Sequence, residues 1–123
     1  MRYLVLLKAV PPDTAPPAEL MAGIMQLGQQ ATEAGVLLDT AGLAPSAQGA
    51  RVGLADGKIT VTDGPFAESK EMISYALYEV STREEATEWT NRFLALHRDL
   101  WPGWSGEADV LRVFGPADFA PPA

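Results

Sequence analysis

One short segment of the chain combines a tight turn with several ionisable side chains. Asp63, Gly64 and Pro65 have the residue types of a turn, and Glu68 and Lys70 follow closely. Glycine allows close backbone geometry and proline restricts it, so a stiff turn is expected. A carboxylate beside an ammonium at a pocket rim can bind a polar ligand or move a proton. The same residues also suit a structural loop whose polar groups satisfy one another, so both interpretations stay open.

Three side chains outside that charged cluster are further candidates. Phe66 can anchor the loop in the core. Asp39 ends a predicted short strand, where it either contributes to a site or caps the next turn. Tyr75 shares a strand face with Leu77, which makes it either core or cavity lining; a phenol in a cavity can orient a substrate carbonyl. The candidate ligand-binding set is therefore Asp39, Asp63, Phe66, Glu68, Lys70 and Tyr75.

The single histidine, His97, is the side chain whose unperturbed pKa lies nearest to neutral pH. Helical spacing from Trp89 places it at the edge of a buried stripe and not at its centre. We therefore expect it to contact helix neighbours or solvent and to miss the charges at Asp63 and Lys70. The sequence predicts that His97 is not catalytic, and it identifies no catalytic residue in its place.

Composition excludes several classes of function. The chain has 123 residues and a mass of 13.1 kDa, which fits one domain. It has no cysteine and one histidine, so thiolate sites and multi-histidine metal sites are excluded, and we expect no transition metal and no cofactor. Nine basic and sixteen acidic residues give a net charge of −7, without the basic footprint that nucleic-acid binding needs.

Hydropathy gives no sign of a membrane or an export signal. No stretch approaches the roughly 20 apolar residues of a membrane span. The apolar run at the N-terminus is too short for a signal peptide, and Lys8 interrupts it. We therefore expect a cytoplasmic protein without a membrane partner.

Periodicity and turn chemistry predict the elements that position these residues. Pro16-Pro17 opens a helix that Gly35 closes, and Asp56-Gly57 is a strong two-residue hairpin signal. A second helix follows a capping box, Ser81 with Glu84 or Thr82 with Glu85, and ends at Pro102-Gly103. Its predicted apolar face carries Ala86, Trp89, Phe93, Leu96 and Leu100. Strands are predicted over residues 3–9, 36–40, 51–55, 58–62, 72–80 and 108–114.

This order of elements predicts an α+β fold, a ferredoxin-like split βαβ sandwich with an inserted β-hairpin. Two helices suffice for one sheet face, yet the strand over residues 3–9 is apolar on both faces, so the other face needs a cover. A second copy of the chain is the economical cover, which predicts a homodimer packed sheet to sheet. The alternative is a monomer whose hairpin folds over that face.

The segment Asp63–Glu71 reads DGPFAESKE and resembles the DGPFAETKE signature of the YCII-related, or DGPF-domain, proteins. Ser69 is the only departure from it. Other matching segments are Met1–Leu4, Ala34–Leu37, Gly42-Leu43, Asp56–Lys58 and Trp101–Trp104, so the resemblance runs from about Met1 to Phe114. A nine-residue motif in this context is a specific signal. It predicts one YCII-related domain over residues 1–115, followed by a C-terminal tail over residues 116–123.

The resemblance implies a homodimeric α/β barrel and says less about activity. Some YCII relatives are similar to muconolactone isomerase and a few degrade chlorinated aromatics, with a presumed catalytic His–Asp pair whose histidine lies on the first helix. Here Gly23 lies near that position and no histidine occurs between Pro17 and Gly35, although Asp39 lies near the family's aspartate. The pair therefore cannot be carried over. Genes of this type often neighbour extracytoplasmic-function sigma factors, which suggests a regulatory setting and a functional link to such a factor.

Two functions of different classes follow. The absent first-helix histidine favours a small-ligand-binding or regulatory module in a homodimeric barrel. The complete signature with its charged cluster keeps an alternative open: a cofactor-free small enzyme, isomerase-like or lyase-like, acting on a small organic acid or an aromatic-derived lactone.

Overall fold

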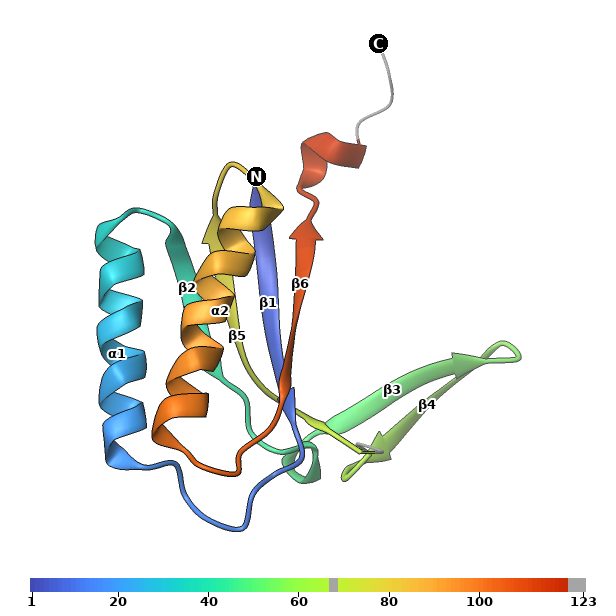
Figure 1. Cartoon of the computed structure of the whole chain (residues 1–123). Coiled ribbons are helices and arrows are strands. Elements are labelled where there is room, and N and C mark those ends of the chain that lie inside the picture. Colours follow the sequence, from blue (N-terminus) through green and yellow to red (C-terminus); the bar gives the residue numbers. More distant parts are fainter. Residues whose placement is uncertain (67–68, 120–123) are drawn as a thin grey trace.

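The fold is an antiparallel sheet with two helices on one face and a separate β-hairpin (Figure 1). The structure is a computed structural model, which describes residues 1–66 and 69–119. Its strands are β1 (Arg2–Ala9), β2 (Leu37–Gly42), β3 (Ala50–Ala55), β4 (Lys58–Asp63), β5 (Glu71–Glu79) and β6 (Glu107–Val113). Its helices are α1 (Ala18–Glu33) and α2 (Arg83–Leu100), with short 3₁₀ turns at Ser46–Gln48 and Pro116–Phe119.

The main sheet has the strand order β2-β5-β1-β6, and neighbouring strands are antiparallel. This is the order of a ferredoxin-like split βαβ fold, so the predicted α+β fold class is confirmed. The hairpin β3–β4 forms its own two-stranded sheet between β2 and β5 in the chain. The strand boundaries differ from the prediction by one or two residues: β2, for example, begins at Leu37 and continues to Gly42, and β5 runs from Glu71 to Glu79.

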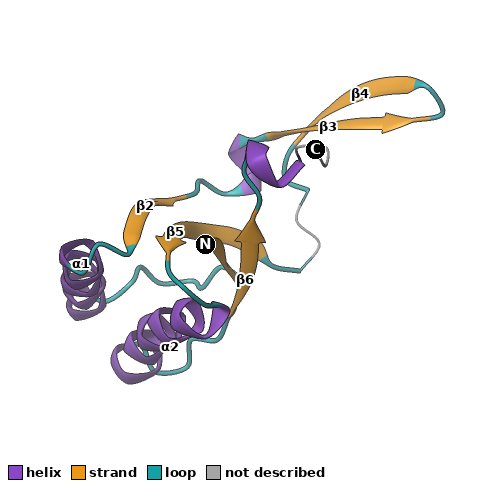
Figure 2. Ribbon diagram, turned by 90° about the horizontal axis from the view of Figure 1, so that it is seen from above, coloured by secondary structure: helices purple, strands orange, loops and turns teal. Residues whose placement is uncertain are grey.

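The core lies between the sheet and the helices, and β1 supplies its centre. Tyr3, Val5, Leu7 and Ala9 are buried, whereas the alternate residues of β1 point to the opposite, open face of the sheet. Helix residues Leu20, Ala31 and Ala86 and strand residues Tyr78 and Val80 complete the buried set. Both helices cover this one face of the sheet (Figure 2). The sequence predicts the same arrangement, with one apolar face of β1 under the helices and the other left open.

Helix α1 ends in a Schellman motif. Gly35 has φ +77°, a region that glycine enters without steric cost. The Gly35 amide donates to the Thr32 carbonyl and the Val36 amide donates to the Ala31 carbonyl, both at 3.0 Å. These bonds satisfy carbonyls at the helix end and direct the chain into β2, as the sequence predicts for this glycine.

Helix α2 begins at the Thr82 alternative of the capping box. The Thr82 side chain accepts a 3.2 Å hydrogen bond from the Glu85 amide, and the Glu85 carboxylate accepts one from the Ser81 amide. The predicted apolar face is turned inward, with Ala86 buried and Trp89, Phe93, Leu96 and Leu100 half-buried. The buried side of α2 is wider than predicted, because Thr90 and His97 are also buried. Thr90 tolerates burial because its hydroxyl donates to the Ala86 carbonyl at 2.8 Å.

The β3–β4 hairpin projects from the sheet (Figures 1 and 2). Asp56 and Gly57 have φ angles of 52° and 77°, the positive values of a type I′ turn, as predicted. Figure 2 shows the helices on one side of the sheet and the hairpin on the other, pointing away from it. The structure therefore does not have the hairpin folded over the open face.

No helix within residues 1–66 and 69–119 is long and apolar enough to cross a membrane.

Candidate functional site

An open cavity of about 600 Å³ lies where the signature segment meets the end of the main sheet. Its walls come from the β2–β3 connection, the base of the hairpin, the signature loop and the adjoining ends of β1, β5 and β6. Both charged and apolar side chains line it. The lining residues with long or polar side chains are Lys8, Leu43, Ser46, Gln48, Arg51, Phe66, Ser69, Lys70, Glu71, Met72 and Glu107.

Ser46 joins three segments at the floor of this cavity. Its hydroxyl donates to Glu71 Oε1 at 2.7 Å, and its amide donates to Glu71 Oε2 at 3.2 Å. The same hydroxyl accepts the Phe66 amide at 3.3 Å. Ser46 is buried, and a buried polar group needs such partners. The Ser46–Glu71 contact therefore ties the β2–β3 connection to the start of β5, while Phe66 attaches the signature loop to both.

Gly64 is required at the turn of the signature because the backbone of Ser46 lies against it. A Cβ atom on Gly64 would overlap the Ser46 carbonyl oxygen. On the other side of the turn Phe66 is half-buried, and the Arg51 guanidinium lies 4.3 Å from the centre of its ring. This distance is within the range of a cation–π contact, so Phe66 fixes the loop and a hairpin cation together.

Three of the lining residues, Lys8, Lys70 and Glu107, belong to a chain of ion pairs. Lys70 Nζ lies 2.9 Å from Glu107 Oε1, and Lys8 Nζ lies 2.6 Å from Asp109 Oδ2 and 3.9 Å from Glu107 Oε1. The hydrogen bond to Asp109 raises the pKa of the Lys8 ammonium above its ordinary value. The Lys8 ammonium therefore stays charged at neutral pH, and the side chains of Lys8 and Lys70 are both partly solvent-accessible.

A second polar contact lies on the open face of the sheet, outside the lining of the cavity. The Tyr75 hydroxyl donates to Asp39 Oδ2 at 2.9 Å. This bond is the main cause that raises the pKa of Tyr75 above its ordinary value, because it stabilises the neutral phenol. Asp39 thus pairs with a tyrosine of the neighbouring strand.

The structure divides the six candidate residues into separate groups. Phe66 and Lys70 line the cavity. Asp39 and Tyr75 pair with each other on the open face. Asp63 is exposed at the end of β4 and is not part of the cavity lining. Glu68 lies outside the described residues.

Sequence reasoning missed Lys8, Ser46, Arg51 and Glu107 as cavity residues. They come from four separate segments, and only the folded chain brings these together. One signal was present for Lys8, which interrupts an otherwise apolar strand with a charge. Ser46 lies in a segment with the sequence of an ordinary loop, so the sequence pattern did not indicate that its side chain is buried.

Gly23 lies in the contact between the two helices. A Cβ atom there would lie 3.3 Å from Cδ2 of Leu96 on α2, closer than most side chains approach. This is the position that the resemblance aligned near the histidine of some relatives. In this chain Gly23 lets the two helices pack closely, and α1 contains no histidine.

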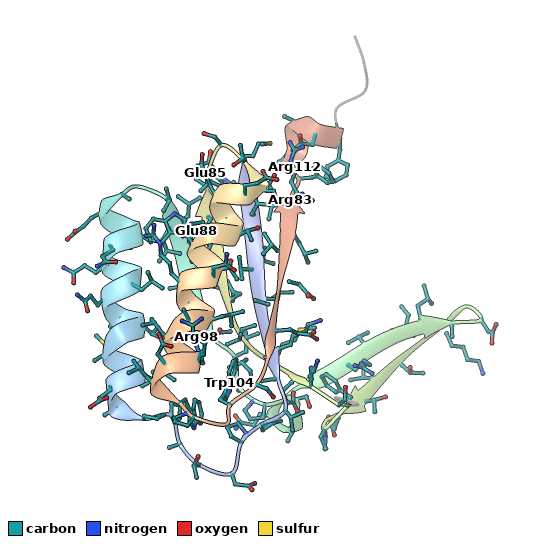
Figure 3. All side chains as sticks on the ribbon, in the orientation of Figure 1. Arg83, Glu85, Glu88, Arg98, Trp104 and Arg112 are labelled. Atoms are coloured by element: carbon teal, nitrogen blue, oxygen red, sulfur yellow. The ribbon has the colours of Figure 1, made fainter. Side chains whose placement is uncertain are left out.

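His97 is buried deeper than the sequence suggested, with 4% of its surface exposed. The predicted place at the edge of the stripe was wrong because Trp104 folds over the ring, with the two ring centres 4.4 Å apart. Figure 3 shows Trp104 at the C-terminal end of α2. His97 Nδ1 donates to the Phe93 carbonyl at 2.9 Å, and burial lowers the pKa of His97 below its ordinary value. Trp101 stacks near Trp104 and extends this aromatic cover.

Within the part of the chain that the structure describes, no group of three or more histidine, aspartate or glutamate side chains is placed to hold a metal ion. The cavity instead offers ammonium and guanidinium donors, carboxylate acceptors and apolar surface from Leu43, Phe66 and Met72. Such a lining suits a small organic molecule that has one polar end and one apolar part.

Comparison with known proteins agrees with the signature. The family model described as YCII-related domain matches residues 1–97, which is more than half of the chain. No curated protein matches the chain significantly. The match includes the complete signature Asp63–Glu71, both helices up to His97 and the first five strands. The chain therefore belongs to the YCII-related family.

Proposed function

We propose that this YCII-related protein is a small-ligand-binding module, with its site in the cavity at the signature loop. The observation that carries the proposal is the cavity of about 600 Å³, lined by Phe66, Lys70 and Glu71 of the signature itself. Ligand sites commonly have volumes of about 300 to 1,000 Å³. The contacts of Ser46 with Gly64 and Glu71 hold described residues on either side of the signature loop against the β2–β3 connection.

The chemistry of the lining favours a small polar organic molecule. Lys70 and Arg51 provide cationic donors in the lining, and the Phe66 ring, which Arg51 contacts, provides an apolar surface. Glu107 lies 2.9 Å from Lys70 and 3.9 Å from Lys8. A ligand carboxylate can therefore replace Glu107 at Lys70 while Glu107 keeps Lys8 as a partner. A ligand with a carboxylate or carbonyl group fits this arrangement best.

An enzymatic role for the same cavity is the competing proposal. Its lining has charged groups, but the Tyr75–Asp39 pair lies outside it, and His97 is buried beneath Trp104 on the helix side of the sheet. A general acid or base must reach the substrate. These three side chains therefore support binding more than catalysis.

We also propose that the working form is a homodimer that covers the open sheet face. Leu4, Leu6, Leu77 and Leu111 occupy adjacent positions on that face, and Leu111 is 49% exposed. Ion pairs such as Arg2–Glu79 and Lys8–Asp109 border them. An apolar centre with a polar rim is typical of protein interfaces.

The binding proposal is tested with a panel of small organic acids and lactones, screened against the full chain by ligand-observed NMR. We expect members of the panel to bind, and Lys70→Met and Phe66→Ala to weaken their binding at least tenfold. Lys58→Met is the matched control, because Lys58 lies at the tip of the hairpin, away from the cavity. Its affinities should equal those of the unmodified protein.

Incubation with the lactones then separates binding from turnover. Unchanged ligand after prolonged incubation supports the module, and product formation that Lys70→Met abolishes supports the enzyme. Absence of any binding by the panel, or binding that Lys70→Met and Phe66→Ala leave intact, contradicts a site in this cavity.

A further inference from the structure

The β3–β4 hairpin carries an apolar face that ligand binding does not explain. Val52 pairs with Val61 and Leu54 pairs with Ile59, so the four side chains share one face. Each is between 67% and 72% exposed. A two-stranded hairpin is at best marginally stable alone in water. Exposed apolar surface of this kind marks a site of interaction.

The position of the hairpin limits what can cover this face. Figure 2 shows the hairpin on the side of the sheet opposite the helices, extending outward from it. A molecule seated on the open sheet face therefore lies beside the hairpin. One partner can then contact both apolar surfaces at once.

The charges on the open face and its rim suit a second copy of the chain. The cations are Arg2, Lys8 and Lys70, and the carboxylates are Asp39, Glu79, Glu107 and Asp109. Among the described residues, these side chains leave one excess negative charge, whereas the whole chain has a net charge of −7. Two such faces therefore repel each other little, although the protein as a whole is acidic.

The size of the open face also points to a contribution from the hairpin. Four residues of β1, four of β5, four of β6 and two of β2 point to this face, fourteen in all. A standard stable interface uses about 20 to 30 residues on each side. The four apolar hairpin residues extend the surface toward that size.

We propose that the hairpin is a docking arm, which packs Val52, Leu54, Ile59 and Val61 against a second copy seated on the open sheet face. The inference rests on the proposed homodimer and adds the element that clasps the partner. It also connects assembly to the cavity, because Arg51 belongs to the same strand as Val52 and Leu54 and lies against Phe66. Docking of the arm then fixes the cavity wall that Arg51 provides.

Sedimentation of the full chain over a range of concentrations tests the arm. The double variant Leu54→Asp/Ile59→Asp places two charges on the apolar face, and Ala55→Asp/Thr60→Asp places two on the opposite face of the same strands. We expect the first pair to raise the dimer dissociation constant at least tenfold and the second to change it less than threefold. Circular dichroism verifies that each variant is folded, as expected for exposed positions.

The outcomes separate the arm from the dimer itself. A monomer at every concentration overturns both proposals. A dimer that Leu111→Asp dissociates but Leu54→Asp/Ile59→Asp leaves intact overturns the arm alone.

Hydrogen exchange of the unmodified protein provides a measurement that needs no variant. The hairpin amides should be protected in the dimer and should exchange faster on dilution to monomer. Fast exchange in the dimer overturns the arm. Protection of the hairpin amides that persists in the dissociated monomer shows that they are protected without the partner and also overturns the arm.

Discussion

The Ser46 hydroxyl donates a 2.7 Å hydrogen bond to Glu71 Oε1, while the Ser46 amide donates to the other oxygen of the same carboxylate. One serine thereby engages both oxygens of the last residue of the signature. The same hydroxyl accepts a hydrogen bond from the Phe66 amide. The cavity floor therefore depends on a residue from a different part of the chain, and the signature keeps its shape partly through Ser46.

Ser46→Ala should destabilise the protein. It removes the hydroxyl bonds to Glu71 and Phe66 at a buried position, and loss of such a partner costs about 1 to 3 kcal/mol. Ser105→Ala, an exposed change before β6, should alter the free energy of unfolding by less than about 0.5 kcal/mol. Urea denaturation measures both.

Glu71→Gln tests the same network from the other side, because an amide nitrogen would then face a Ser46 donor. The double variant Ser46→Ala/Glu71→Gln should lose less stability than the two single changes added together, since the partners act as a unit. Strict additivity would show that the two residues stabilise the protein independently, contrary to this view of the cavity floor.

Gly64→Ala should destabilise the protein because its Cβ would overlap the Ser46 carbonyl oxygen. Forcing an extra methyl group into a packed site typically costs about 1 to 3 kcal/mol. Gly42→Ala is the matched control, since no atom lies within 4 Å of the new Cβ. Thermal unfolding of the two variants should differ clearly, and equal midpoints would mean that the turn has room to relax.

Protonation of His97 should weaken the fold below neutral pH. Burial lowers its pKa in the folded state, so the unfolded state, with a pKa of about 6.5, binds the proton first. The contribution of His97 to the free energy of unfolding is constant above the unfolded-state pKa. It declines as the pH falls through that pKa and stops declining once the pH lies below the folded-state pKa. His97→Gln should remove this component from the pH dependence of unfolding.

The folded-state pKa of His97 can be read directly by NMR titration, because the chain has one histidine. A pKa at or above the ordinary 6.5 in the folded protein would contradict the effect of burial beneath Trp104.

Local rules predicted most of the fold. Three features depend only on neighbouring residues, and each appears in the structure. They are the two faces of β1, which alternate residue by residue, the helix end at Gly35 and the Asp56-Gly57 turn. The burial of His97 was not predictable in this way. It depends on Trp104, which reaches the ring from the loop after the helix, and helical spacing contains no information about that loop.

The candidate site was predictable only in part. Two of the residues that the signature suggested, Phe66 and Lys70, lie in the lining of one cavity; that they bind a ligand stays a prediction. Tyr75 and Asp39 meet through the β2–β5 register, which a bulge between Leu37 and Asp39 shifts. A shift of one residue moves side chains to the other face of a strand, so sequence alone could not assign the face on which Asp39 lies.

The Tyr75–Asp39 pair gives a last test, because both side chains lie on the face that we propose to be covered in the dimer. In the monomer both side chains are accessible, and water can replace the phenol, so Tyr75→Phe should leave the folded monomer intact. In a covered interface the same change leaves Asp39 without its donor, and an unpaired buried carboxylate is costly. We therefore expect Tyr75→Phe to raise the dimer dissociation constant several-fold in sedimentation experiments.

Asp39→Asn/Tyr75→Phe should restore part of the loss, because the neutral amide needs no charge partner. An unchanged dissociation constant for Tyr75→Phe would place this pair outside the interface.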